Sequence, residues 1–411
     1  MIVPHNAGDQ GEHDLNVDRR IFLLAGGSAL AARAAPSNQI SLGVIGSGGR
    51  GTFVMGVFEK SPDVRVAAIC DVYEPNLEHA LSEARKSGSP AKAYRDYRRL
   101  LDNKDIDAVL IATPEHWHYQ MVLDAIAAGK DIYVEKPLCQ TPEQGITLIE
   151  AEKNSKSIIQ VGMQRRSYDL YLEGRKIVAS GVLGNVRMVR SWWLNNNLGA
   201  PRATSLEGHL DWDQWQGPAP RRSFDPNRFR NWREYSDYSG GIVADQGAHV
   251  YDGIHLLMNA GYPSAVNASA GRIHKPDVDT PESVVVIAEY PEDFLATFTI
   301  NYAAMHYKLH NDQLNQFDGD KARMDIGRED CNVYVQGSED RPSITKISQF
   351  GFAHATDLHV ANFLECIRTR KTPTAPIKLG FQAALVTQLA NMSLRQGRRI
   401  RWNNESRRVE A

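Results

Sequence analysis

The sequence predicts an α/β protein in which a doubly wound parallel sheet is followed by an α+β domain with a large, mostly antiparallel, open sheet. Up to about residue 163, apolar β-branched segments alternate with helical patterns, which favours parallel strands covered by helices on both faces. Beyond that point, strand patterns follow one another about a tight turn. A chain of 411 residues is long enough for two to three domains. We expect a signal peptide or N-terminal arm at 1–35, the doubly wound domain at 36–163 and a second domain at 164–411.

The composition is that of an ordinary globular protein and excludes several classes. Hydrophobic residues make up 42% and charged residues 23% of the chain, and 47 basic against 49 acidic residues give a net charge of −2. There is no basic stripe of the kind that binds nucleic acid, so no nucleic-acid partner is expected. The four cysteines are too few and too scattered for a disulfide scaffold or a CxxC metal site, and we interpret them as small buried hydrophobic residues. They are Cys70, Cys139, Cys331 and Cys366.

The N-terminus has the pattern of a targeting segment. Arg19 and Arg20 precede a short, weakly apolar stretch that ends in Ala32-Arg33-Ala34, which is typical of a signal peptide cleaved at an A-x-A site. The paired arginines resemble a twin-arginine export signal, and this predicts a periplasmic or exported protein. The alternative is an N-terminal arm with a chance arginine pair on a cytoplasmic protein. The stretch is too short for a membrane span, so no stable membrane anchor is expected.

A glycine-rich turn follows the first predicted strand, residues 39–45. The turn Gly46-Ser47-Gly48-Gly49-Arg50-Gly51 satisfies G-x-G-x-x-G and leads into a helical stretch, residues 52–59. In such a turn the first glycine allows the tight bend, the second lets the backbone approach a pyrophosphate, and the third lets helix and strand pack closely. The sequence therefore predicts a dinucleotide-binding Rossmann domain. The residues expected to hold the phosphates are Gly46, Gly48, Gly49, Arg50 and Gly51.

Asp71 ends the second predicted strand, residues 64–70. An acidic residue about twenty positions after the glycine turn is placed to accept hydrogen bonds from the adenosine ribose. Its negative charge would repel a 2′-phosphate. The sequence therefore favours NAD over NADP.

The alternation of helices and strands continues to the end of the first domain. Helices are predicted at 74–86, 94–101, 119–128 and 143–155, and strands at 106–112, 131–135 and 158–162. In a doubly wound sheet the ligand lies beyond the carboxyl ends of the strands. Besides the glycine turn and Asp71, these ends carry further candidate cofactor-binding residues, namely Thr113, Pro114, His118, Glu135 and Lys136.

Several longer motifs resemble the glucose–fructose oxidoreductase / inositol dehydrogenase / rhizopine-catabolism (Gfo/Idh/MocA) family. They are Ala112-Thr113-Pro114-Glu115-His116-Trp117-His118, then Ala127 to Pro137 with its Glu-Lys-Pro end, then Gly181 to Val186, then Gly240 to Asp252 with its D-x-x-x-H helix. The resemblance covers residues 38 to 402. It implies that Lys136, Asp245 and His249 line the substrate side of the nicotinamide and are the catalytic residues. It also implies that the free face of the second domain's sheet forms a homodimer or homotetramer.

The chemistry of these three residues agrees with the roles that the resemblance implies. Asp245 and His249 are four positions apart and so share one face of a helix. His249 is expected to titrate near neutrality, as a base that takes a hydroxyl proton. Lys136 can polarise the reacting oxygen. Arg165 and Trp232 are further candidates for substrate binding.

The remaining polar residues near these motifs have open interpretations. Asp252 either orients the His249 imidazole or is a solvated helix residue. His116 and His118 are interpreted as loop residues, either structural or touching substrate. Together with Asp245 and His249 they contain no tight ligand motif such as H-E-x-x-H, so no metal is expected.

The second domain begins with a helix at 168–180 and a strand at 186–193. A long polar stretch at 195–238, rich in tryptophan and arginine and without clear secondary structure, either covers a sugar site or packs against the sheet or another subunit. Further strands are predicted at 266–272, 283–290, 294–301, 322–326, 332–336 and 399–402, and helices at 355–368 and 376–396.

We therefore expect an NAD-dependent oxidoreductase that acts on a hydroxyl or keto group of a sugar, polyol or glycoside. The first alternative is an NAD-dependent glycoside hydrolase that uses transient oxidation and elimination. That branch of the family lacks the lysine of Glu-Lys-Pro, and Lys136 favours a plain dehydrogenase. The second alternative is a non-catalytic NAD-binding protein, against which the complete set of Lys136, Asp245 and His249 argues. Because free NAD is scarce outside the cytoplasm, an exported enzyme is expected to carry its NAD tightly bound.

Overall fold

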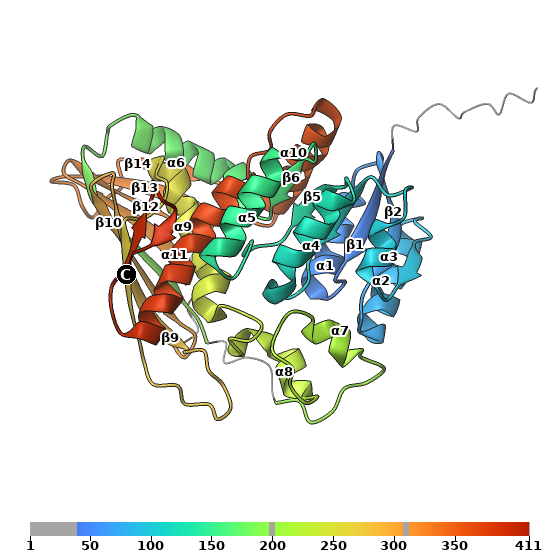
Figure 1. Ribbon diagram of the computed structural model, residues 1–411. Coiled ribbons are helices and arrows are strands. Elements are labelled where there is room, and N and C mark those ends of the chain that lie inside the picture. The colour runs from blue at the N-terminus through green and yellow to red at the C-terminus, as the bar shows by residue number, and fades with distance from the viewer. Residues whose placement is uncertain (1–38, 197–201, 306, 308–311, 411) are drawn as a thin grey trace, which may run out of the picture. The chain divides into compact units, whose positions relative to one another are not determined.

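The computed structural model describes residues 39–196, 202–305, 307 and 312–410. Two sheets organise this part of the chain (Figure 1). The first has six parallel strands in the order β3-β2-β1-β4-β5-β6. Its strands are β1 (Ile40–Ile45), β2 (Val64–Cys70), β3 (Lys92–Tyr94), β4 (Ala108–Ile111), β5 (Asp131–Val134) and β6 (Ile159–Val161).

This strand order places the topological switch point between β1 and β4, where ligands bind in doubly wound sheets. β1, β4 and β5 are buried at every position, as expected for strands covered on both faces. The helices of this domain are α1 (Gly49–Phe58), α2 (Glu74–Lys86), α3 (Tyr97–Leu101), α4 (Glu115–Ala127) and α5 (Pro142–Lys153).

The second sheet has ten strands in the order β14-β13-β12-β11-β7-β10-β9-β8-β15-β16. Neighbouring strands in it are antiparallel except β10 and β7, which are parallel. Burial alternates along β9 and β10, so one face of the sheet packs inward and the other is more open. Its strands are β7 (Val186–Leu194), β8 (Ala265–Ala270), β9 (Ser283–Tyr290), β10 (Phe294–Asn301), β11 (Gln313–Gly319), β12 (Ala322–Ile326), β13 (Asp330–Val335), β14 (Ile344–Ile347), β15 (Ile400–Asn403) and β16 (Arg408–Val409).

The inner face of the second sheet is covered by helix α9 (Gly241–Met258), which is buried along most of its length. Phe298 and Tyr251 meet edge to face between β10 and α9, with ring centroids 6.1 Å apart. Helix α6 (Asp169–Ala179) and the short η1 (Gln164–Ser167) connect the two sheets along the chain.

The last two helices return to the first sheet. In Figure 1, α11 (Ile377–Gln396), drawn in red, lies beside the green α5. Phe363 of α10 (His354–Thr369) packs edge to face on Phe58 of α1 and on Tyr133 of β5. Residues from the C-terminal third of the chain therefore complete the hydrophobic core of the first domain.

The segment from residue 202 to 240, here called the strap, differs from its prediction. It was expected to lack secondary structure, yet it contains α7 (Trp212–Gln216), α8 (Pro226–Arg230) and the short η2 (Trp232–Glu234). Asp211 and Asp225 cap the first two of these helices with their side chains, and such capping is a short-range signal that composition alone does not reveal. The strap has a small core of its own, formed by Trp215, Ala219, Tyr235 and Tyr238.

The strap is bound to the first domain by backbone and aromatic contacts. The Tyr73 hydroxyl donates to the Glu207 carbonyl at 2.8 Å, and the Asp211 amide donates to the Val72 carbonyl at 3.0 Å. The rings of Tyr73 and Phe229 meet with centroids 4.9 Å apart. This segment was expected either to cover a sugar site or to pack against the sheet or another subunit. The structure shows it packed against the first domain, and several of its residues also line the cavity described below.

Other predictions can be compared with the structure one by one. All four cysteines are buried and unpaired. Strands β3, β11, β14 and β16 were not predicted, and helix α4 begins four residues earlier than expected, at Glu115. No helix in the described ranges is both long and apolar enough to cross a bilayer.

Candidate active site

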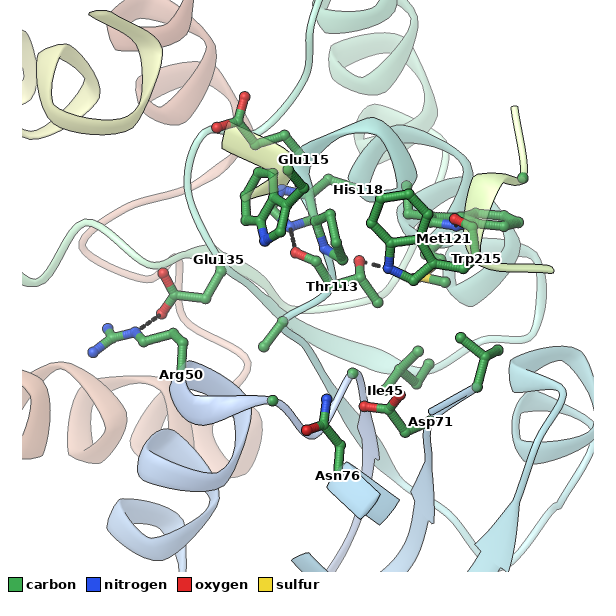
Figure 2. A pocket seen from close by; sticks show the side chains of 18 of the residues that line it. Ile45, Arg50, Asp71, Asn76, Thr113, Glu115, His118, Met121, Glu135 and Trp215 are labelled. Atoms are coloured by element: carbon green, nitrogen blue, oxygen red, sulfur yellow. Dashed lines mark hydrogen bonds and ion pairs between the residues drawn. The ribbon is translucent and has the colours of Figure 1, made fainter. Parts of the chain in front are cut away.

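A cavity of about 1000 Å³ lies at the carboxyl ends of the first sheet and is closed by residues of the strap, β7 and α9. Figure 2 shows Asp71 and Asn76 on one side of this cavity, and Arg50 and Glu135 paired on another. The sequence-predicted residues that line the cavity are Gly46, Gly48, Gly49, Arg50, Asp71, Thr113, Pro114, His118, Glu135, Lys136, Trp232, Asp245 and His249.

Close backbone contacts require the glycines at two positions of the turn. Gly46 has φ +83°, and a Cβ there would lie 2.7 Å from the Thr113 amide nitrogen. A Cβ on Gly51 would lie 2.0 Å from the Gly46 carbonyl oxygen, so Gly51 is confined to the strand–helix contact and does not line the cavity. The cavity around Gly49 is open, with nothing within 4 Å of its Cβ position. This cradle at the start of α1 fits a dinucleotide pyrophosphate.

Arg50 and Glu135 form an ion pair across the mouth of this cradle. Arg50 Nε lies 2.8 Å from Glu135 Oε1. Burial alone would lower the pKa of Arg50, but the Glu135 charge outweighs it and the pKa is raised. Arg50 Nη2 is buried without a partner among the described residues. This guanidinium nitrogen lies beside the cradle with a hydrogen-bond donor that the described residues leave free, so it is placed to donate to a phosphate oxygen.

Asp71 is held at the tip of β2 by its neighbours. Its carboxylate accepts from the Ser47 amide at 2.8 Å, from the Ser47 hydroxyl at 3.1 Å and from the Tyr73 amide at 2.9 Å. Burial raises the pKa of Asp71, and these hydrogen bonds partly offset the shift. The Asp71 side chain also lines the cavity, so a ribose hydroxyl can approach its carboxylate from that side.

Lys136 and Asp245 meet at the other end of the cavity, from the end of β5 and the second turn of α9. Lys136 Nζ donates to Asp245 Oδ1 at 2.6 Å and to the Asp245 carbonyl at 2.7 Å. Arg233 Nε lies 3.3 Å from the second carboxylate oxygen. Burial would raise the pKa of Asp245, but the charges of Lys136 and Arg233 outweigh it and the pKa is strongly lowered. Asp245 is therefore a carboxylate at neutral pH.

His249 lies one helical turn beyond Asp245 and is buried beneath Trp193. Their rings are stacked, with centroids 6.5 Å apart. The pKa of His249 is lowered well below its usual value by burial and then by the charges of Lys136 and Arg165. The expectation that His249 titrates near neutrality is therefore wrong, because burial and two nearby cations disfavour the imidazolium. His249 is neutral at pH 7.

Two other polar residues are placed differently from their interpretations. Arg165 does not line the cavity but is buried behind Trp193, where it donates to the Tyr171 hydroxyl at 2.7 Å and to Gln313. Asp252 neither orients His249 nor faces solvent, because it forms a buried ion pair with Arg166 at 2.5 Å.

His116 and His118 lie in the first turn of α4 and not in a loop. The His118 ring nitrogens face the carbonyls of Pro137 at 2.7 Å and Thr113 at 2.9 Å. His116 Nε2 lies 3.0 Å from the Trp215 carbonyl, and burial lowers its pKa to about 4. Both imidazoles are therefore engaged by backbone. Within the described ranges, no group of three or more His, Cys, Asp or Glu residues is placed to bind a metal.

Several lining residues were not predicted as site residues, although Trp215 and Arg233 belong to the stretch at 195–238 for which covering a sugar site was one interpretation. These lining residues are Glu115, Gln164, Trp193, Trp215, Arg233, Gln246 and Phe352. For Glu115 the sequence did contain a signal, because this residue directly follows Thr113-Pro114 at a strand end. Trp193 and Phe352 reach the cavity from β7 and from a loop before α10, and nothing in their local sequence indicates that contact. Arg233 stacks on Trp232, with its guanidinium carbon 4.2 Å from the ring centroid.

Comparison with known proteins identifies the two parts of the chain separately. Residues 40–163 match the model of the oxidoreductase family with an NAD-binding Rossmann fold, and residues 171–325 match the GFO/IDH/MocA C-terminal domain. Inositol 2-dehydrogenase 2 of Saccharopolyspora erythraea is 32% identical over 166 residues, which are 40% of this chain and 47% of that protein. Levoglucosan dehydrogenase of Pseudarthrobacter phenanthrenivorans is 30% identical over 198 residues, which are 48% of this chain and 44% of that protein. These two sequence matches thus cover less than half the length of each relative.

Solved structures show the same fold over most of the chain. A levoglucosan dehydrogenase in complex with NADH and levoglucosan superposes with a TM-score of 0.70 at 20% identity, covering 88% of this chain and 99% of that one. The predicted fold, with its parallel first sheet and mostly antiparallel second sheet, is confirmed. The two matched regions together account for more than half of the sequence, and the chain belongs to the GFO/IDH/MocA family of oxidoreductases with an NAD-binding Rossmann fold.

Proposed function

We propose that this protein uses NAD to interconvert a hydroxyl and a keto group on a sugar or polyol, with Lys136, Asp245 and His249 as the catalytic residues. The observation that carries the proposal is the placement of a Lys136–Asp245 ion pair and a neutral His249 in the same cavity as the glycine cradle. The relatives named as inositol and levoglucosan dehydrogenases support this class of substrate.

The chain's own groups divide the work of removing a hydroxyl proton. NAD, when bound, supplies the hydride acceptor. The Lys136 ammonium polarises the substrate oxygen, and Asp245 fixes the position of Lys136. His249 accepts the hydroxyl proton at Nε2, because Nδ1 is buried and has no partner among the described residues. During oxidation His249 thus takes the hydroxyl proton, while bound NAD would take the hydride; during reduction His249 returns the proton.

Aromatic side chains make the same end of the cavity suitable for a carbohydrate. Trp193, Trp232 and Phe352 line it together with Gln164 and Gln246. Aromatic faces pack against sugar C–H groups, while amide groups bind hydroxyls. The glycoside hydrolase and the non-catalytic alternative are not favoured, since Lys136 is present and ion-paired and the named relatives are dehydrogenases.

The first test is turnover. The purified protein with NAD and a panel of sugars, polyols and glycosides should produce NADH absorbance without releasing an aglycone. Lys136→Ala and His249→Ala should lower kcat by about 10²–10⁴, the usual loss when a positioned acid–base group is removed. NAD affinity should change little in both variants, and the thermal stability of His249→Ala should stay close to that of the wild type, as in the exposed control Lys153→Ala. Lys136→Ala should also lower thermal stability, because it leaves the buried Asp245 carboxylate without its ammonium partner. Near-full activity in His249→Ala would show that the base lies elsewhere.

We also propose that Asp71 selects NAD over NADP. Its carboxylate ends β2 inside the cavity, where the adenosine ribose of a dinucleotide lies in this fold. A 2′-phosphate there would meet a negative charge.

Titration by fluorescence should therefore give tighter binding of NAD than of NADP. Asp71→Ser should narrow the difference, by roughly tenfold if one like-charge contact is removed. Asp63→Ser, at an exposed position outside the cavity, should leave the ratio of the two affinities unchanged. Equal or tighter binding of NADP to the wild type would overturn the assignment.

We further propose that the protein is exported through its twin-arginine-like signal with NAD already bound. The signal residues, including Arg19 and Arg20, lie outside the described residues. The strap supports tight retention, since Trp215, Phe229 and Arg230 line the cavity while the Trp117 indole donates to the Trp215 carbonyl at 2.9 Å. A dinucleotide bound beneath the strap would be held by these residues, which slows its release. The reaction would then be closed by a second substrate or by re-reduction of the same sugar.

Protein purified without added nucleotide should release NAD on acid denaturation, in an amount approaching one per chain. A fusion of residues 1–35 to a reporter should be exported, and Arg19→Lys with Arg20→Lys should block export. A periplasmic protein that is purified empty and turns over only with added NAD would contradict the proposal.

Finally, we propose a homodimer or homotetramer formed through the outer face of the second sheet. Val285, Ile287 and Leu295 are 43%, 38% and 37% exposed on the neighbouring strands β9 and β10. Adjacent exposed aliphatic residues on one sheet face are typical of an interaction surface.

Sedimentation velocity should show the wild type as a dimer or tetramer. Ile287→Arg should shift it towards the monomer, because a charge would be buried in the contact. Leu172→Arg places the same charge at an equally exposed aliphatic residue on α6, and it should leave the assembly intact. A monomeric wild type at micromolar concentration would rule out this surface.

A further inference from the structure

The N-terminus of α9 is capped by a residue of the other domain. Gly240, the residue that precedes this helix, has no side chain to cap it, and a Cβ there would lie 2.4 Å from the Ala244 Cβ. The capping acceptor must therefore come from elsewhere. Glu115, the first residue of α4, supplies it: the Gly240 amide donates to its Oε2 at 2.9 Å.

Ser239 extends this contact to the next amide of the helix. The Ser239 hydroxyl donates to Glu115 Oε1 at 2.8 Å and accepts from the Gly241 amide at 3.0 Å. The Glu115 side chain is buried, and its residue is only 2% exposed. Two backbone amides at the start of α9 thus depend, directly or through one hydroxyl, on a single carboxylate, whose charge also suits the positive end of the helix dipole.

The helix that Glu115 caps is the one that carries the proposed catalytic groups. Asp245 lies one turn beyond Gly240, and its own carbonyl and carboxylate both hold Lys136. Any displacement of the first turn of α9 would change the position of these acceptors relative to Lys136. We propose that Glu115 is a positioning residue for the reaction, which fixes the first turn of α9 and thereby the Lys136–Asp245 pair. This inference rests on the proposed function.

The rest of the first turn of α4 has the same connecting role. The His116 amide donates to the Tyr238 carbonyl at 3.3 Å, and the His116 and Trp117 rings both contact the Trp215 carbonyl. These contacts hold the strap, while Glu115 holds the helix that follows it. The sequence Glu115-His116-Trp117 therefore joins the first domain to both elements that close the cavity.

The charge of Glu115 is sensitive to pH near neutrality. Burial, and then the charge of Asp245, raise its pKa to about 7, although the hydrogen bonds from Gly240 and Ser239 and the charge of Lys136 oppose the shift. Asp245 is itself paired with Arg233, whose Nε lies 3.3 Å from its carboxylate. His116 and His118 on the same helix have lowered pKa values and remain neutral. As pH falls through about 7, Glu115 gains a proton and the cap loses its charge.

The test compares two carboxylates that cap helices, the buried Glu115 and the half-buried Glu152. Glu115→Gln keeps the side-chain volume but removes the charge and one acceptor. Glu152→Gln is the matched control: Glu152 accepts from the Ile377 amide at the start of α11, its pKa is also raised by burial, and it does not line the cavity. Ser239→Ala removes only the hydroxyl and serves if Glu115→Gln does not fold.

Hydrogen–deuterium exchange of the full chain requires no substrate. In Glu115→Gln the amides of residues 240–245 should exchange roughly ten times faster or more, as expected when a hydrogen bond to a charged group is lost. In Glu115→Gln, amides in the rest of the chain should exchange at the wild-type rate. In Glu152→Gln, all amides of α9 should exchange at the wild-type rate. In the wild type, protection of this turn should weaken as pH falls through about 7, and this step should be absent from Glu115→Gln. Ser239→Ala should show the same change more weakly.

Turnover separates the positioning role from a purely structural one. Glu115→Gln should lower kcat by roughly 10- to 100-fold, the cost of a small misplacement of reacting groups, with NAD affinity unchanged. If the wild type is active and Glu115→Gln retains both its kcat and the protection of α9, the inference is overturned while the proposed function stands. If the wild type oxidises nothing in the panel, the proposed function fails, and the exchange data alone decide whether Glu115 caps α9.

Discussion

The Lys136–Asp245 ion pair is the interaction on which the architecture of the site depends. It joins the carboxyl end of β5 in the first domain to α9 in the second, through two hydrogen bonds from one ammonium. Both side chains are largely buried, with 12% and 11% exposure. A buried pair of this kind contributes little net stability compared with apolar residues, but removing one partner leaves a costly unpaired charge. Its effect is therefore to fix the position of α9 relative to the end of β5.

The charge of this pair determines the state of its neighbours. The ammonium of Lys136 lowers the pKa of Asp245 and of His249 and opposes the rise in the pKa of Glu115. The site thus holds a permanent carboxylate, a neutral imidazole and a carboxyl group that titrates near neutrality within one cavity. Environments that separate the pKa values of nearby groups in this way are typical of acid–base sites.

The cavity is closed by elements that are distant in sequence. The strap meets the first domain through Tyr73, Trp117 and backbone hydrogen bonds, and α10 completes the core beside Phe58. The boundary between the two domains in sequence is therefore not a boundary in packing. The first sheet needs residues from the C-terminal helices to cover it, and its ligand-binding edge needs the strap.

The sequence by itself determined the elements whose physics is local. The G-x-G-x-x-G turn, the strand-ending Asp71 and the i, i+4 spacing of Asp245 and His249 follow from backbone sterics, strand polarity and helix periodicity. Each could be assigned from adjacent residues, and the structure places Asp71, Asp245 and His249 in the cavity, while Gly51 lies at the strand–helix contact. Asp211 and Asp225 show the limit of this reasoning. Each caps a helix of five residues, which is too short to produce a periodic hydrophobic pattern in the sequence.

Only the tertiary structure decided which groups share an environment. His249 has an ordinary sequence context, and its low pKa arises from burial and from cations that approach from β5 and from behind Trp193. Arg165 follows a strand end like the true lining residues, yet it turns behind Trp193 and away from the cavity. Glu115 and Gly240 are separated by 125 positions, and nothing in either segment alone indicates that one caps the other. Burial, charge and long-range hydrogen bonds depend on how elements pack, and packing is a property of the whole chain that local patterns do not encode.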